Sequence, residues 1–154
     1  MTMEEGRPLL DDARRNGHRL LQAGSVLFLL GLLVGLAVPR LAVPRLGLST
    51  HLLGITQGTL LMVAGLAWPR LRLTRGQSAL GSLLAIYGSA AAWTANLLGA
   101  VWGAGSAMVP LAAGGAHGTV LQEGLIRVLL VSAALSLIGF AGLLVWGLRG
   151  KEST

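Results

Sequence analysis

The sequence predicts an all-α integral membrane protein, a bundle of four membrane-spanning helices. Hydrophobic residues make up 53% of the 154 residues and charged residues 12%, roughly half the charged share of a soluble domain. Four apolar stretches fill most of the chain, and each has the length of about 18 residues or more that crosses a bilayer. Glycine pairs four residues apart, Gly31 with Gly35 and Gly54 with Gly58, allow helices to approach closely in lipid. These pairs favour a tight bundle that oligomerises.

The spans follow from the apolar runs and from the residues that end them. Pro39 and Pro69 end the first and second runs, because proline cannot continue a helix. Ser49 or Thr50 suits the N-cap of the second span. Between these spans a direct repeat, 37–41 and then 42–46, predicts an extended connector stiffened by proline. The predicted spans are about 20–38, 51–68, 78–102 and 120–148, with a glycine-rich loop at 103–118.

The polar ends define the domain organisation. Residues 1–18 are polar and of mixed charge, so we expect a flexible or interface-lying cytoplasmic tail. Residues 19–150 form the four-helix membrane domain, and residues 151–154 form a C-terminal tail.

The basic residues predict the orientation in the membrane. Nine of the twelve Lys and Arg residues lie on the side of the two termini, and Arg40 and Arg45 lie on the other side, with Arg127 if it is counted. The positive-inside bias then places both termini in the cytoplasm of a cell, with the spans in its inner membrane. The net charge of +6 lies at the ends of apolar runs rather than in a patch, so we expect a lipid partner and no nucleic acid. The nine residues are Arg7, Arg14, Arg15, Arg19, Arg70, Arg72, Arg75, Arg149 and Lys151.

His51 is a rare ionisable residue, located where the second apolar run begins. One interpretation is a histidine near an N-cap that forms a hydrogen bond with a loop. The other is an axial ligand of a haem between helices, since the chain has no cysteine to supply a thiolate. No second histidine faces His51 from within a span, so the sixth iron position would stay open and suit Lewis-acid chemistry.

Further polar residues are expected at the same outer level of the bundle. Asn96, Glu123 and Arg127 lie there, close to a solvated His117 in the loop. Glu123 and Arg127 share a helix face because they are four residues apart, which favours a local ion pair and, as the alternative, a role in orienting a substrate.

Three residues lie deeper in the predicted spans. Tyr87 lies near the middle of the third span, and its hydroxyl needs a partner or a ligand. Trp93 is expected to pack inside the bundle or to face a pocket. Gln57 lies about two turns below the start of the second span.

Several segments resemble a known family. Residues 19–35 read RLLQAGSVLFLLGLLVG and residues 43–58 read VPRLGLSTHLLGITQG; Tyr87-Gly88, VPLAAG at 109–114 and VWGLRG at 145–150 follow. In order and spacing this chain resembles the hydroxylaminobenzene mutases, small four-span membrane enzymes related to styrene oxide isomerase. The resemblance covers about residues 19–150 and is most specific around His51.

The resemblance implies a homotrimer with haem b at a subunit interface and a histidine matching His51 as axial ligand. An asparagine six positions later handles the substrate oxygen in the styrene oxide isomerase branch, and this chain has Gln57 there. The mutases carry a histidine and an asparagine where this chain has Ala23 and Ala92.

The implied activity is that of an isomerase. It rearranges a small aromatic substrate that enters from the bilayer, such as hydroxylaminobenzene to 2-aminophenol, by Lewis-acid activation of the N–O or C–O oxygen. Gln57 and Tyr87 would form hydrogen bonds with the moving oxygen. The alternatives are an epoxide-to-aldehyde rearrangement as in styrene oxide isomerase, a haem-binding relative that has lost its reaction, and a non-catalytic membrane scaffold or transport subunit.

Overall fold

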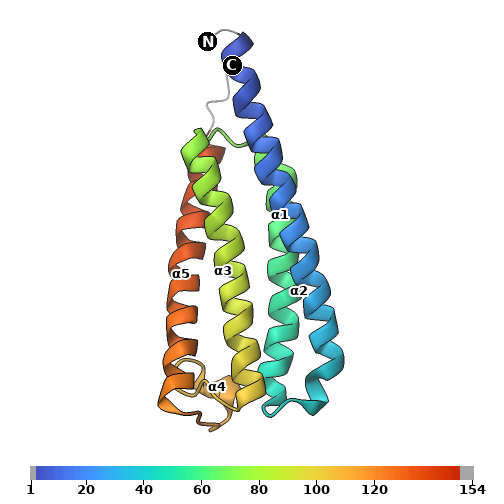
Figure 1. Ribbon diagram of the computed structural model, residues 1–154, viewed down its shortest axis with the longest axis vertical. Helices are drawn as coiled ribbons and strands as arrows, with labels where there is room; N and C mark the ends of the chain where they lie inside the picture. The colour runs from blue at the N-terminus through green and yellow to red at the C-terminus, as the bar shows by residue number, and fades with distance from the viewer. Residues whose placement is uncertain (1–2, 150–154) are drawn as a thin grey trace.

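The computed structural model describes the backbone of residues 3–149 and the side chains of residues 11–149. Within this part the chain is helical, with no strand (Figure 1). Four helices are long and apolar enough to cross a membrane, which confirms the predicted all-α fold with four spans. The helices are α1 (Met3–Ala37), α2 (Pro44–Ala67), α3 (Arg75–Trp102), the short α4 (Pro110–Ala113) and α5 (Val120–Leu148), with 3-10 turns η1 (Val38–Arg40) and η2 (Trp68–Arg70).

The long helices pack as two antiparallel pairs joined through α3. Helix α1 packs along α2 and α3 packs along α5, while α3 also contacts both α1 and α2. Helix α1 begins and α5 ends at one end of the bundle, which we call the terminal end (Figure 1). The opposite end carries η1 and α4, and we call it the loop end. Short connections at both ends keep sequential helices antiparallel.

We expected a flexible or interface-lying tail before the first span; residues 3–18 are not a flexible tail, because they belong to α1. Two polar residues of this segment, Asp12 and Asn16, have partners on α3. Asp12 accepts from Arg15 at 2.9 Å and from Arg75 at 3.0 Å. Asn16 is 4% exposed, and its amide donates to the Ser78 hydroxyl at 3.0 Å. The predicted tail at 151–154 lies outside the described residues.

The second span begins earlier than predicted, at Pro44 rather than at His51. Proline suits the first turn of a helix because the N–H that it lacks would have no intrahelical partner there. Ser49 and Thr50 are therefore inside α2 rather than at its N-cap, and their hydroxyls donate to the carbonyls of the preceding turn. The connector shrinks to η1 and three further residues. His51 thus lies about 10 Å along α2 from its first residue, at 1.5 Å per residue.

The last two spans begin near their predicted positions. Thr74 precedes α3 and Thr119 precedes α5, and each forms a capping box with the glutamine three residues later. Such reciprocal side-chain bonds satisfy the free N–H groups of the first turn. Helix α5 has the predicted bounds of 120 and 148.

Facing glycines form the seam between α1 and α2. A Cβ added to Gly24 would lie 2.6 Å from the carbonyl oxygen of Gly58, which is far closer than van der Waals contact. The two backbones therefore touch with no side chains between them, as expected of small residues in membrane helices. Along the seam the facing pairs are Gly17 with Gly65, Gly24 with Gly58, and Gly31 with Gly54.

A buried tryptophan ties the terminal end together. Trp68 is 1% exposed and stacks on Phe140 of α5 with 6.3 Å between ring centroids. Its indole N–H donates to the Ser78 hydroxyl at 2.9 Å, the same oxygen that Asn16 contacts. One hydroxyl thus joins α1, η2 and α3, and the polar atoms buried at this end have partners, as buried polar groups require.

Candidate functional site

His51 lies at the seam between α1 and α2, with its imidazole half-buried. Its Nδ1 is 2.8 Å from the carbonyl oxygen of Gly31. Because a carbonyl only accepts hydrogen bonds, Nδ1 carries the proton in the neutral ring and Nε2 keeps an unprotonated lone pair. This is the form in which imidazole binds a metal. The N-cap interpretation of His51 is wrong, because the residue lies about two turns into α2 and forms its hydrogen bond with α1 instead of a loop.

The His51 ring faces an apolar groove of about 550 Å³, which we call the His51 groove. A Cβ on Gly35 would lie 2.5 Å from Nδ1, so the ring occupies space that only glycine leaves free. The groove opens outward, since Leu36 is 76% exposed and Leu48 is 51% exposed. Its lining consists of Leu32, Leu33, Gly35, Leu36, Val38, Pro39, Leu48 and His51.

Gln57 faces a different direction from His51. Six residues along an α-helix turn the side chain by about 120° around the axis. The Gln57 amide oxygen accepts from the Ser89 hydroxyl at 3.1 Å, across the contact between α2 and α3. Gln57 therefore does not line the His51 groove of its own chain.

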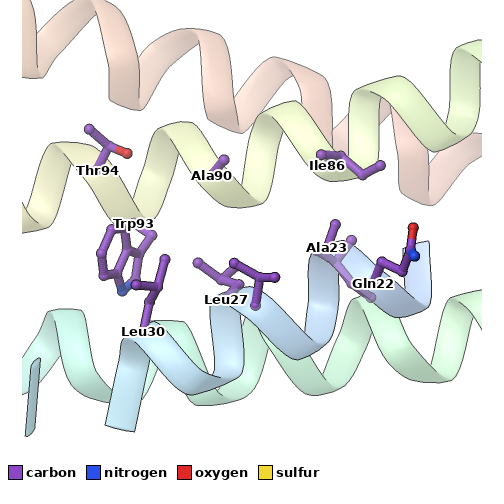
Figure 2. A pocket seen from close by; sticks show the side chains of 10 residues that line it. Gln22, Ala23, Leu27, Leu30, Ile86, Ala90, Trp93 and Thr94 are labelled. Carbon is purple, nitrogen blue, oxygen red and sulfur yellow. The ribbon is translucent and has the colours of Figure 1, made fainter. Parts of the chain in front are cut away.

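A second apolar groove of about 370 Å³ runs between α1 and α3, and we call it the Trp93 groove. Figure 2 shows Leu27 and Leu30 of α1 opposite Ala90 of α3, with the Trp93 indole beside Leu30. The indole N–H is buried against Gly54 and has no hydrogen-bond partner in the structure. Both expectations for Trp93 hold, because the ring packs inside the bundle and also lines a pocket.

The two positions that depart from the mutase pattern differ in environment. Ala23 lines the Trp93 groove (Figure 2), which a larger polar side chain there would narrow. Ala92 is buried in a separate cluster with Ala91 and Ala133, at the contact between α3 and α5.

Tyr87 has the hydroxyl partner that its depth requires. The phenol oxygen lies 2.8 Å from the Ser132 hydroxyl of α5. Ser132 donates its own proton to the carbonyl of Leu129 at 3.1 Å, so the Tyr87 hydroxyl donates to Ser132. The ring is 44% exposed on the outside of the bundle. Its phenol oxygen therefore keeps acceptor capacity for a further group.

Glu123 holds the loop that follows α3. Its carboxylate accepts from the backbone N–H groups of Gly105 at 2.8 Å, Gly118 at 3.1 Å and Ala107 at 3.3 Å. Backbone donors to a carboxylate form strong, charge-assisted hydrogen bonds. The side chain therefore acts as a clamp on the loop.

The predicted ion pair between Glu123 and Arg127 is wrong. Among the described side chains, ion pairs join Asp12 to Arg15 and to Arg75, and Arg127 forms none. The backbone N–H groups of the loop have taken the place of the guanidinium, while Arg127 points outward beside Val128 and Val131.

The predicted convergence of polar groups on one outer layer does not produce a single pocket. Asn96 donates to the carbonyl of Ala92 in its own helix at 2.9 Å, and His117 lies 2.6 Å from the Ser106 hydroxyl in the exposed loop. Neither residue lines the His51 groove. Within one chain, the structure also leaves Gln57 and Tyr87 on other faces than His51.

Three partner groups were not identified from the sequence. Ser89 and Ser132, which bond Gln57 and Tyr87, are polar residues within apolar spans, and this was a usable signal, although each span carries other hydroxyls as well. The Gly31 carbonyl that bonds His51 leaves no mark in the sequence, because every residue has a carbonyl.

These features define a multi-pass membrane protein in which a histidine, a side chain of a type that binds metals, lies in an apolar groove beside the seam between α1 and α2. Residues 16–149 match the family model for styrene oxide isomerase. The chain therefore belongs to the styrene oxide isomerase family, and the resemblance read from the sequence is confirmed.

Two relatives are close. The chain is 50% identical to hydroxylaminobenzene mutase HabB of Ectopseudomonas oleovorans over 136 residues, which cover 88% of this chain and 83% of the relative. It is 46% identical to hydroxylaminobenzene mutase HabA of the same organism over 113 residues, or 73% of this chain and 84% of the relative. No solved structure matches this chain.

Proposed function

We propose that this chain rearranges an arylhydroxylamine, such as hydroxylaminobenzene, to 2-aminophenol within the membrane. Its family makes it a membrane isomerase that acts on an aromatic compound. The observation that carries the choice of substrate is the 50% identity to a hydroxylaminobenzene mutase over 88% of the chain.

The reaction is an internal rearrangement. The N–O bond breaks, a C–O bond forms at the ortho carbon, and the proton displaced from the ring is balanced by one gained at nitrogen. No external electron donor is needed. An acid must draw on the hydroxylamine oxygen, and the surroundings must protect the cationic ring from water.

Haem b fits the His51 groove as the source of that acid. Nδ1 of His51 is bonded to the Gly31 carbonyl, which leaves Nε2 free to bind iron. The walls are leucine, valine and proline, as a macrocycle with apolar faces requires. When bound there through His51, the haem would supply a Lewis acid to draw on the substrate oxygen.

The residues of the His51 groove give the ring apolar surroundings and leave a route by which a substrate can reach it. Leu32, Leu36 and Leu48 surround the face of the His51 ring with apolar side chains, which offer water no hydrogen-bond partner. Their exposure to the surroundings of the bundle gives an aromatic substrate dissolved in the bilayer a lateral path to the same face.

A homotrimer completes this site in our proposal. A ring of identical copies joins two different faces of each copy, so a second face of one copy closes the His51 groove of the next. In that arrangement Gln57 and Tyr87 of the neighbouring copy can form hydrogen bonds with the substrate oxygen, although neither lines the His51 groove of its own chain. The many exposed leucines on the long helices are available for such contacts.

The membrane setting follows from the charges. We propose that the terminal end faces the cytoplasm of a cell and that the spans lie in its inner membrane. Most basic residues lie at this end, as the positive-inside bias requires.

The proposed reaction is tested on membranes that contain the chain. Incubation with hydroxylaminobenzene should yield 2-aminophenol, and purified protein should show a haem absorption band that His51→Ala removes. Membranes without the chain are the control. Formation of no aminophenol above this control would overturn the proposed reaction.

Epoxide isomerisation is the second candidate function, because the matching family model is that of styrene oxide isomerase. It needs the same acid acting on a C–O oxygen. Phenylacetaldehyde formed from styrene oxide, in the absence of aminophenol from hydroxylaminobenzene, would favour it. Family membership does not favour the scaffold or transport alternative.

A further inference from the structure

The glycine pair Gly31 and Gly35 of α1 forms a cradle for the His51 ring. The Nδ1 of His51 lies 2.8 Å from the Gly31 carbonyl oxygen. In an α-helix this same carbonyl accepts the N–H of the residue four positions later, which is Gly35. The oxygen has two lone pairs and can accept both donors.

Gly35 leaves the Gly31 carbonyl accessible to the His51 ring. A Cβ at this position would lie 2.5 Å from Nδ1 and 2.8 Å from Cε1 of His51. The conflict is with the ring itself, which packs directly on the helix backbone. Any larger residue at 35 would cover the carbonyl or push the ring out of the seam.

The environment strengthens this hydrogen bond. The ring is half-buried and its surroundings are apolar. Away from water, loss of the hydrogen bond would leave an unsatisfied N–H, so the bonded ring orientation and the Nδ1–H tautomer are favoured together.

We infer that Gly31 and Gly35 are positioning residues which fix His51 in the Nδ1–H tautomer and present Nε2 to the groove. The GxxxG spacing on α1 thus serves imidazole orientation as well as helix packing. Partners that orient a metal-binding histidine also raise its affinity for the metal. The consequence for a bound haem rests on the proposed function, whereas the tautomer does not.

Nitrogen-15 NMR of histidine-labelled, full-length protein without added haem tests the tautomer directly. The His51 signals are identified by their loss in His51→Gln. We expect a protonated Nδ1 and an unprotonated Nε2. Protonation at Nε2 alone, or fast averaging of both tautomers as in solvated histidine, would overturn the inference whether or not the protein binds haem.

Gly35→Ala tests the positioning role, with Gly24→Ala as the matched control. Both substitutions crowd the same α1–α2 seam, but only position 35 faces His51. We expect haem affinity, read from absorption titration, to be about 10- to 100-fold lower in Gly35→Ala than in Gly24→Ala. Any loss in Gly24→Ala itself reports the crowded seam alone.

The outcomes separate the positioning role of the two glycines from the proposed binding of haem. Equal haem affinities in Gly35→Ala and Gly24→Ala would overturn the positioning role while leaving the haem proposal intact. The expected tautomer in a protein that binds no haem would support the cradle and refute the haem. Should Gly35→Ala fail to fold, the NMR measurement on the unsubstituted chain still decides.

Discussion

Gly58→Ala should weaken the contact between α1 and α2 because the added methyl meets backbone. Its Cβ would lie 2.7 Å from the amide nitrogen of Phe28 and 2.8 Å from the carbonyl oxygen of Gly24. Neither atom can move alone, so the helices must separate by roughly 1 Å to restore ordinary contact distances. Overpacking of this kind costs about 1–3 kcal/mol.

Gly142→Ala is the matched control, since a Cβ there meets nothing within 4 Å. Both alanines gain the same helix propensity, about 0.5–1 kcal/mol, which cancels in the comparison. Gly58→Ala should therefore be less stable than Gly142→Ala by about 1–3 kcal/mol, or roughly 5- to 150-fold in the unfolding equilibrium. Titration of both purified variants with SDS in mixed micelles measures this difference. Identical unfolding midpoints would refute the idea that backbone contact holds the seam.

Two further predictions concern hydrogen bonds. Trp68→Phe should lower the free energy of unfolding by about 0.5–1.5 kcal/mol more than Trp93→Phe, because the Trp68 indole donates to Ser78 while the Trp93 indole has no partner. The same SDS titration measures this difference. A greater loss of stability in Trp93→Phe would contradict the prediction. Glu123→Gln should speed amide hydrogen exchange at Gly105 by about tenfold or more, since the loop loses charge-assisted bonds. Unchanged protection of that amide would show that the carboxylate does not hold the loop.

The sequence predicts the fold well because a bilayer restricts the possibilities. A helix that crosses it with all backbone groups paired needs about 20 consecutive apolar residues, so the four spans follow from the apolar runs of the sequence. The first residues of the helices were harder to predict. Pro44 was interpreted as part of a stiff connector, but it begins α2. The polar segment before residue 19 belongs to α1, where Asp12 and Asn16 find partners on α3.

The candidate site was only partly predictable, because hydrogen-bond partners on other helices depend on packing. His51 was identified as the rare imidazole in an apolar span, yet its bond to a Gly31 carbonyl required the seam geometry. For Glu123 a partner was predicted, but it was the wrong one. Its spacing from Arg127 predicted an ion pair, but a folded loop supplies backbone donors that helical spacing does not reveal.

We propose that His51 carries the isomerase reaction, and turnover of hydroxylaminobenzene by two histidine variants tests this role. His117→Ala is the control, because this residue lies in the exposed loop beside Ser106 and away from the groove. We predict that 2-aminophenol formation falls about 100-fold or more in His51→Ala and stays within about twofold of the unsubstituted rate in His117→Ala. Equal rates of 2-aminophenol formation in the two variants would show that His51 does not carry the reaction.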